Sequence, residues 1–110
     1  MIQTILQIKA CPNRVDDLLK ALKSLMVSAQ AEHGLVSCRL YQEVESEAVF
    51  HYVEDWQTEE DLEYQIRSNR YTQVLALMET ATESPSLEFR TVSRTQGLEF
   101  LQVVRDGGRV

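Results

Sequence analysis

The chain has 110 residues, a formal net charge of −6 and an apolar content of 44%. A chain of this length forms one domain with a modest core, and its acidic balance argues against nucleic acid and anionic membranes as partners. No apolar run approaches the roughly 18 residues that a membrane-spanning helix needs. Its start shows no basic segment leading into an apolar one, and Cys11 and Cys38 stand at no metal-motif spacing. We therefore expect a cytoplasmic protein with reduced thiols and no metal.

The first two elements are a strand and a helix. Residues 2–9 alternate between two faces, which predicts a strand. Over residues 14–32 the apolar side chains recur at helical spacing, which predicts an amphipathic helix. Gly34 is the expected stop after that helix.

The middle of the chain predicts a β-hairpin. Residues 35–44 and 48–56 both alternate, and a polar turn at residues 45–47 joins them. In the second strand both faces carry apolar bulk: Phe50, Tyr52 and Trp56 share one face, and Val49, His51 and Val53 share the other. A sheet with one wet face rarely shows this pattern. Helices are therefore expected on the first face and a partner on the second, where His51 would lie in the interface.

The remaining elements are helical segments and one more strand. Thr58 begins a helix with a capping-box pattern, Ser68 and Asn69 interrupt it, and it resumes as far as residue 81. Residues 87–93 alternate as a fourth strand. Residues 98–104 fit either a short helix or a strand, and we favour the helix. Residues 106–110 are expected to form a loose tail.

This order defines the fold class. The sequence β-α-β-β-α-β predicts an α+β, ferredoxin-like split βαβ domain over residues 1–105, with an antiparallel sheet and helices on one of its faces. The other face is left bare. Two such sheets packed together would cover it, so we expect a homodimer, through the sheet face, in the form of a dimeric α+β barrel.

Three stretches of this chain resemble the antibiotic biosynthesis monooxygenase (ABM) superfamily. They are residues 31–42 with Gly34 and Tyr41, the strand that ends Glu54-Asp55-Trp56, and the helical residues 62–75. The resemblance implies a dimeric α+β barrel that needs no metal and often no organic cofactor. The members of the superfamily include quinol and polyketide oxygenases, haem-degrading enzymes and many proteins of unknown role, so the resemblance is compatible with an oxygenase.

The chain departs from that pattern at three places. Gln65 stands where many members have a His, and an amide cannot act as a base near neutral pH. Tyr52 stands where related polyketide oxygenases pair an Asn with the Trp. Residues 71–78 contain no His, so the iron ligand of the haem-degrading branch is missing.

The candidate site residues follow from the aromatic strand and this resemblance. Trp56 would stack on an aromatic substrate and Tyr52 would donate its phenol to a substrate oxygen, and these two are the candidate catalytic residues. Candidate substrate-binding residues are Tyr41, Gln65 and Tyr71. Each also fits an ordinary structural role: core aromatics for the Trp and Tyr side chains, and an exposed helix position for the Gln. The acidic pair Glu54-Asp55 is most simply part of a solvated turn.

Two functional hypotheses remain open. The first is a cofactor-independent monooxygenase acting on an aromatic phenol, quinol or polyketide-like substrate. The alternative is a non-catalytic barrel that binds a small molecule or serves as an accessory subunit. Fold alone does not decide between them.

Overall fold

The computed structural model describes residues 1–108 and contains one four-stranded antiparallel sheet in the order β2-β3-β1-β4. The elements in chain order are β1 (Ile2–Lys9), a 3-10 turn (Pro12–Arg14), α1 (Val15–Ala29), β2 (Leu35–Gln42), β3 (Val49–Trp56), α2 (Glu59–Ile66), α3 (Asn69–Glu79), β4 (Ser86–Thr91) and α4 (Leu98–Arg105). The predicted α+β, ferredoxin-like fold is confirmed.

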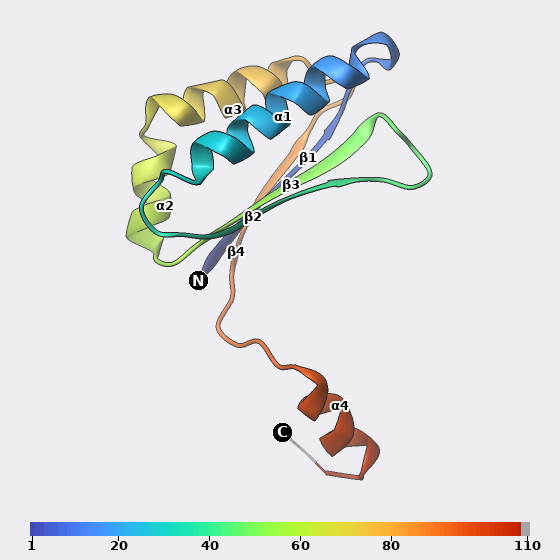
Figure 1. Cartoon of the computed structure of the whole chain (residues 1–110), viewed down its shortest axis with the longest axis vertical. Coiled ribbons are helices and arrows are strands. Elements are labelled where there is room, and N and C mark those ends of the chain that lie inside the picture. Colours follow the sequence, from blue (N-terminus) through green and yellow to red (C-terminus); the bar gives the residue numbers. More distant parts are fainter. Residues whose placement is uncertain (109–110) are drawn as a thin grey trace.

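The helices α1 and α3 lie side by side over one face of the sheet, and α2 lies at the end where β3 stops (Figure 1). Side chains alternate across a strand, so β3 directs Phe50, Tyr52, Glu54 and Trp56 toward the helices. We call this the inner face and its opposite the open face. The predicted split of the strand between two faces is confirmed.

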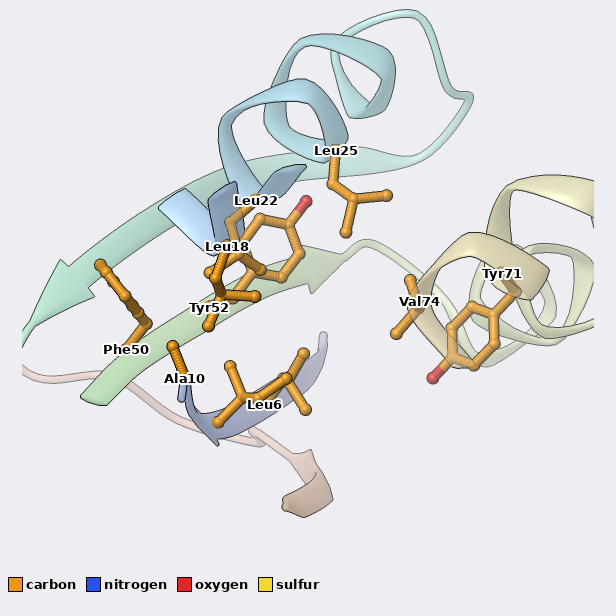
Figure 2. Packing of buried hydrophobic residues seen from close by; sticks show 10 residues of the cluster. Leu6, Ala10, Leu18, Leu22, Leu25, Phe50, Tyr52, Tyr71 and Val74 are labelled. Atoms are coloured by element: carbon orange, nitrogen blue, oxygen red, sulfur yellow. The ribbon is translucent and has the colours of Figure 1, made fainter. Parts of the chain in front are cut away.

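The core lies between the inner face and the two long helices. Leu18, Leu22 and Leu25 of α1 cover Tyr52, while Tyr71 and Val74 of α3 complete the cluster (Figure 2). Leu22 and Phe50 are completely buried. Burying each such side chain stabilises the fold by about 1.5–3 kcal/mol relative to leaving it in water.

Local chemistry explains where the helices begin and stop. The Thr58 hydroxyl accepts from the Asp61 backbone N–H at 3.1 Å, which caps α2, and the Ser68 hydroxyl accepts from the Tyr71 N–H at 3.4 Å, which caps α3. The predicted interruption at Ser68 is therefore confirmed. Gly34, the predicted stop of the first helix, lies beyond the C-cap of α1 at Gln30, so the helix ends before it. Gly34 instead has φ of +86° in the turn before β2, and a Cβ there would collide with Asp61.

Three elements end earlier in the structure than the sequence predicts. The first helix ends at Ala29, not at residue 32, because the N–H groups of residues 30–32 bond three residues back in tight turns. The second strand ends at Gln42, two residues before its predicted end. The fourth strand ends at Thr91, since β1 begins at Ile2. Beyond that residue Met1 and Val92 still exchange two backbone hydrogen bonds, at 2.8 and 3.5 Å.

The open face carries a polar row at one end. The register aligns Ser37, Asp55, Gln3 and Arg90 across all four strands. Asp55 is only 4% exposed because three neighbours donate to it: Gln3 at 2.9 Å, Ser37 at 2.6 Å and Arg39 at 2.8 Å. The open face is thus more polar than the sequence predicts, and its apolar residues Val53 and Ile5 lie at its centre.

The helix predicted at residues 98–104 is confirmed as α4, which stands apart from the sheet and the other helices (Figure 1). Residues 92–97 form no regular structure and carry α4 away from the end of β4. A single domain over residues 1–105 stays a prediction. The last two residues of the predicted tail, 109–110, lie outside the described residues.

Candidate functional site

The site is built around an ion pair that is buried beneath the helices. Glu54 lies on the inner face of β3, and Arg70 reaches it from the first turn of α3. Their side chains are 4% and 7% exposed. Burial alone would lower the pKa of Arg70, but the hydrogen bond and charge of Glu54 more than offset it, so the pKa is raised and the guanidinium stays charged.

Arg70 also donates hydrogen bonds to two other helices, α1 and α2. Its Nη2 donates to the Leu25 carbonyl at 2.8 Å and its Nε to the Ser28 hydroxyl at 2.8 Å, both on α1. Its Nη1 donates to the Gln65 side-chain oxygen on α2 at 3.4 Å. One guanidinium therefore ties α1, α2 and α3 to the centre of the sheet, which fixes the position of the Glu54 carboxylate.

Tyr52 belongs to the same network. Its hydroxyl donates to Glu54 Oε2 at 2.5 Å and accepts from Arg70 Nη2 at 3.1 Å and from the Cys38 thiol at 3.3 Å. Burial, followed by the Glu54 charge, raises the pKa of Tyr52 well above its usual range. The hydroxyl is thus neutral, and its hydrogen-bonding capacity is fully used within the protein.

Three other buried polar atoms in the described part of the chain have no hydrogen-bond partner. They are Nε1 of Trp56, Nε2 of Gln65 and the hydroxyl oxygen of Tyr71. The three residues are 0%, 1% and 7% exposed. Burial, and then the charge of Glu54, raises the pKa of Tyr71 to about 12, so this hydroxyl keeps its proton. All three groups can donate a hydrogen bond, and buried donors seldom go without an acceptor.

Four of the five candidate residues are buried on the side of the sheet that the helices cover. Tyr52, Gln65 and Arg70 are linked by hydrogen bonds, Tyr71 follows Arg70 in sequence, and Trp56 lies two residues beyond Glu54 on the inner face. Tyr41 is not brought to this place. It pairs with His51 in the register of the open face and is 48% exposed.

Sequence reasoning missed Glu54, Arg70 and Cys38. The expectation that Glu54 and Asp55 belong to a solvated turn was wrong: they are 3% and 4% exposed, because both lie within β3, where arginines pair with them. The alternation that groups Phe50, Tyr52 and Trp56 also includes Glu54 and could have found it. No local pattern marks Arg70, whose partners are distant in sequence.

A groove lies between α1 and α3. It consists of two cavities of about 420 and 350 Å³ that share Ala21, Leu77 and Thr80. Leu25 lines the second cavity, and its carbonyl is the one that accepts from Arg70. Neither cavity is lined by Tyr52, Trp56, Gln65 or Tyr71.

Further features of residues 1–108 bear on the expected cofactors and location. No three His, Cys, Asp or Glu side chains in this part of the chain converge as a metal site would require. Both Cys11 and Cys38 are free thiols. None of the described helices is long and apolar enough to cross a bilayer.

The fold and the buried network define a class: a ferredoxin-like α+β domain whose polar site lies between the sheet and its helices. The antibiotic biosynthesis monooxygenase family model matches residues 1–77, and the chain belongs to this family. Among curated proteins, none matches this chain in sequence.

Solved structures share the fold at low sequence identity. A conserved protein from Methanosarcina mazei Go1 is 23% identical, with a TM-score of 0.73 over 81% of this chain and 89% of its own. An antibiotic biosynthesis monooxygenase is 16% identical, with a TM-score of 0.75 over 86% of this chain and 100% of its own. Rv0793 from Mycobacterium tuberculosis is 16% identical, with a TM-score of 0.77 over 87% and 98%.

Proposed function

We propose that this protein is a cofactor-independent monooxygenase that acts on an aromatic phenol, quinol or polyketide-like substrate. Family membership supports the class of reaction. The observation that carries the proposal is the set of buried donors without partners, namely Trp56 Nε1, Gln65 Nε2 and the Tyr71 hydroxyl. A substrate with oxygen acceptors would satisfy them, and an aromatic one would also stack on Trp56.

The chemistry needs little from the protein beyond placement and electrostatics. A deprotonated, electron-rich aromatic can itself reduce O2. For a ring methylene flanked by aromatic rings, one oxygen atom of O2 becomes the new carbonyl and the other leaves as water with the two methylene hydrogens. The site would exclude water, hold the anion and place it against oxygen.

Each of the four buried candidate residues has a proposed role. Trp56 forms the stacking wall, and Gln65 and Tyr71 donate to the substrate oxygen. Tyr52 accepts the proton of the substrate while passing its own proton to Glu54 along the existing 2.5 Å hydrogen bond. For this the Cys38 thiol must first release the Tyr52 oxygen, and a thiol is a weak donor.

A second candidate is ligand binding without turnover, as in a carrier or an accessory subunit. The Tyr52 hydroxyl favours it, since that hydroxyl already has Glu54, Arg70 and Cys38 as partners and has no free capacity toward a substrate. Under this candidate Tyr52 and Arg70 only hold the helices on the sheet, and Trp56, Gln65 and Tyr71 hold the ligand.

We also propose a homodimer that is formed through the open face, in the cytoplasm. The open face leaves Tyr41 half exposed and Ile5 partly exposed, with no helix over either, and a second sheet packed on it would bury both. The two free thiols support a reducing compartment. A monomeric mass at micromolar concentration would contradict the dimer.

The test is oxygen uptake by the metal-free protein with a panel of hydroquinones, naphthalenediols and anthrones. We expect uptake that depends on the protein and falls at least about 10-fold in Trp56→Phe and Tyr71→Phe, as expected when a substrate contact worth about 1.4 kcal/mol is lost. Tyr64→Phe is the matched control, because Tyr64 is 68% exposed on α2. Tight binding without uptake would select the second candidate, and equal uptake by all variants would remove these residues from the site.

A further inference from the structure

The helix α4 has an apolar surface with nothing against it. None of its residues is buried, although five of its eight are apolar. Their exposed fractions are 79% for Leu98, 42% for Phe100, 50% for Leu101, 38% for Val103 and 48% for Val104. Isolated helices shorter than about 12 residues are marginal in water. A helix of this length and composition therefore requires a surface that covers it.

The core is complete without α4, which contributes none of its buried residues. The family model ends at residue 77, before both β4 and α4. The solved antibiotic biosynthesis monooxygenase is matched over 100% of its length by 86% of this chain. The helix α4 stands beyond the sheet and beyond the three helices that pack against it (Figure 1). It is thus not needed to close the core.

The open face alone offers little apolar surface to a second copy. The polar groups in the row around Asp55 already bond to one another. At the centre of the open face, Val53 is only 7% exposed. A stable interface buries about 1,200–2,000 Å² and has an apolar centre with a polar rim. The exposed apolar residues of α4 would supply the centre that the open face lacks.

We propose that α4 packs on a second copy of this chain, so that two copies exchange their C-terminal helices across the homodimer. This inference rests on the dimer proposed above. A two-fold axis makes the exchange reciprocal, so both copies of α4 are covered at once. The open face of the partner also carries exposed charges of both signs, at Arg39, Arg90 and Glu88. These could form ion pairs with Glu99 and Arg105, which lie at the two ends of α4.

The connection to α4 favours a partner over the chain's own body. Residues 92–97 continue past the end of β4 and carry α4 away from the sheet (Figure 1). Six extended residues reach about 20 Å, which is enough to cross to a copy packed on the open face, since stacked sheets lie about 10 Å apart.

The first experiment compares two triple variants of the full chain by sedimentation equilibrium. In Leu98→Gln/Leu101→Gln/Val104→Gln, we expect the dimer dissociation constant to rise about 30-fold or more, because central apolar contacts carry most of the affinity. The control is Val27→Gln/Val44→Gln/Tyr64→Gln, which changes residues of the body that are 75%, 101% and 68% exposed. It should dimerise like the wild type. Circular dichroism verifies that both variants keep the fold.

The outcomes separate this inference from the proposed dimer. A wild type that is monomeric at micromolar concentration would overturn both. A dimer that the α4 variant preserves would overturn the exchange alone. Equal weakening by the control variant would also overturn it, because the effect would then not belong to α4.

A second experiment shows which chain α4 contacts. Phe100 is replaced by the photo-crosslinking residue p-benzoylphenylalanine, and light and ¹⁵N-labelled chains are unfolded together and refolded. We expect crosslinked peptides that join a light α4 to a heavy body. Crosslinks only within one isotope would mean that α4 folds back on its own chain, and the absence of crosslinks would mean that it stays free. Either result would overturn the exchange.

Discussion

Two consecutive acidic residues of β3 lie on opposite faces of the sheet, and each has an arginine. Glu54 faces inward to Arg70, and Asp55 faces outward to Arg39. Both carboxylates are almost fully buried, at 3% and 4% exposure. The arginines differ: the Arg70 side chain is 7% exposed and comes from a helix, whereas the Arg39 side chain is 44% exposed and comes from the neighbouring strand.

Burying the Glu54–Arg70 pair costs free energy, because both side chains lose contact with water. In the Asp55–Arg39 pair the arginine is still hydrated. A fully buried ion pair is often no more stabilising than apolar residues of the same shape, so its presence indicates a role other than stability. We infer that Glu54 and Arg70 serve the proposed proton transfer from Tyr52. The Asp55 pair keeps its arginine at the surface, where a partner chain could reach it.

The largest expected effect is on the inner pair. Glu54→Gln removes the charge that compensates Arg70 and should destabilise the protein by about 3–5 kcal/mol, because the guanidinium is left buried without a counter-charge. Urea unfolding followed by circular dichroism measures this loss. The double variant Glu54→Leu/Arg70→Met should recover most of it, since it removes both charges. A loss below about 1 kcal/mol in Glu54→Gln would show that the inner pair is solvated after all.

The next largest effect is a loss of stability at alkaline pH, which we attribute to the buried Tyr71. Burial raises the pKa of Tyr71 to about 12, whereas an unfolded Tyr titrates near 10. The folded state therefore holds this proton more tightly. Tyr71 should therefore add no pH dependence to the stability below about pH 10, and the stability should fall as the pH rises from about 10 to 12, by on the order of 2 kcal/mol. Unfolding free energies of wild type and Tyr71→Phe, measured along this range, test it: the variant should show the shallower fall, and parallel curves would contradict the assignment.

Tyr52→Phe tests the hydroxyl that completes the inner network. Its removal takes a partner from Glu54, Arg70 and Cys38 together and should cost about 1–3 kcal/mol of unfolding free energy. Tyr64→Phe should cost almost nothing, because Tyr64 is exposed. If Tyr52→Phe is destabilising but leaves oxygen uptake intact, the proton relay is wrong and the residue is structural.

The two faces also show what the sequence could and could not predict. Alternation predicted that Phe50, Tyr52 and Trp56 share a face, and the ferredoxin-like order followed, because strand and helix periods are local properties of the chain. The burial of Glu54 depends on Arg70, which lies sixteen residues away along the sequence and meets it only in the folded state. A charged residue is expected at the surface until its partner is known, so the buried Glu54–Arg70 pair could not be predicted, whereas the burial of the aromatic residues beside it could.

Tyr71→Phe should act in the opposite direction from Tyr52→Phe. The Tyr71 hydroxyl is buried without a partner, so its removal should leave stability unchanged or raise it by about 1 kcal/mol in the unliganded protein. Ligand binding or oxygen uptake should fall in the same variant. This combination is expected of a group kept for a ligand at the expense of stability. A clear loss of stability would indicate a structural partner, such as a buried water, in place of a substrate.

The smallest effect is expected on the open face. Arg39→Gln removes one of three donors to Asp55 and leaves Gln3 and Ser37 in place. Because the Arg39 side chain is 44% exposed, the loss should stay below about 1 kcal/mol and shrink further in high salt, whereas Arg70→Gln should cost several times more. Unfolding at two protein concentrations sharpens the comparison. A cost for Arg39→Gln that approaches that of Arg70→Gln, and that appears only where the protein is dimeric, would mean that a second copy removes water from the open face. The contrast between Glu54 and Asp55 would then hold for the monomer and not for the dimer.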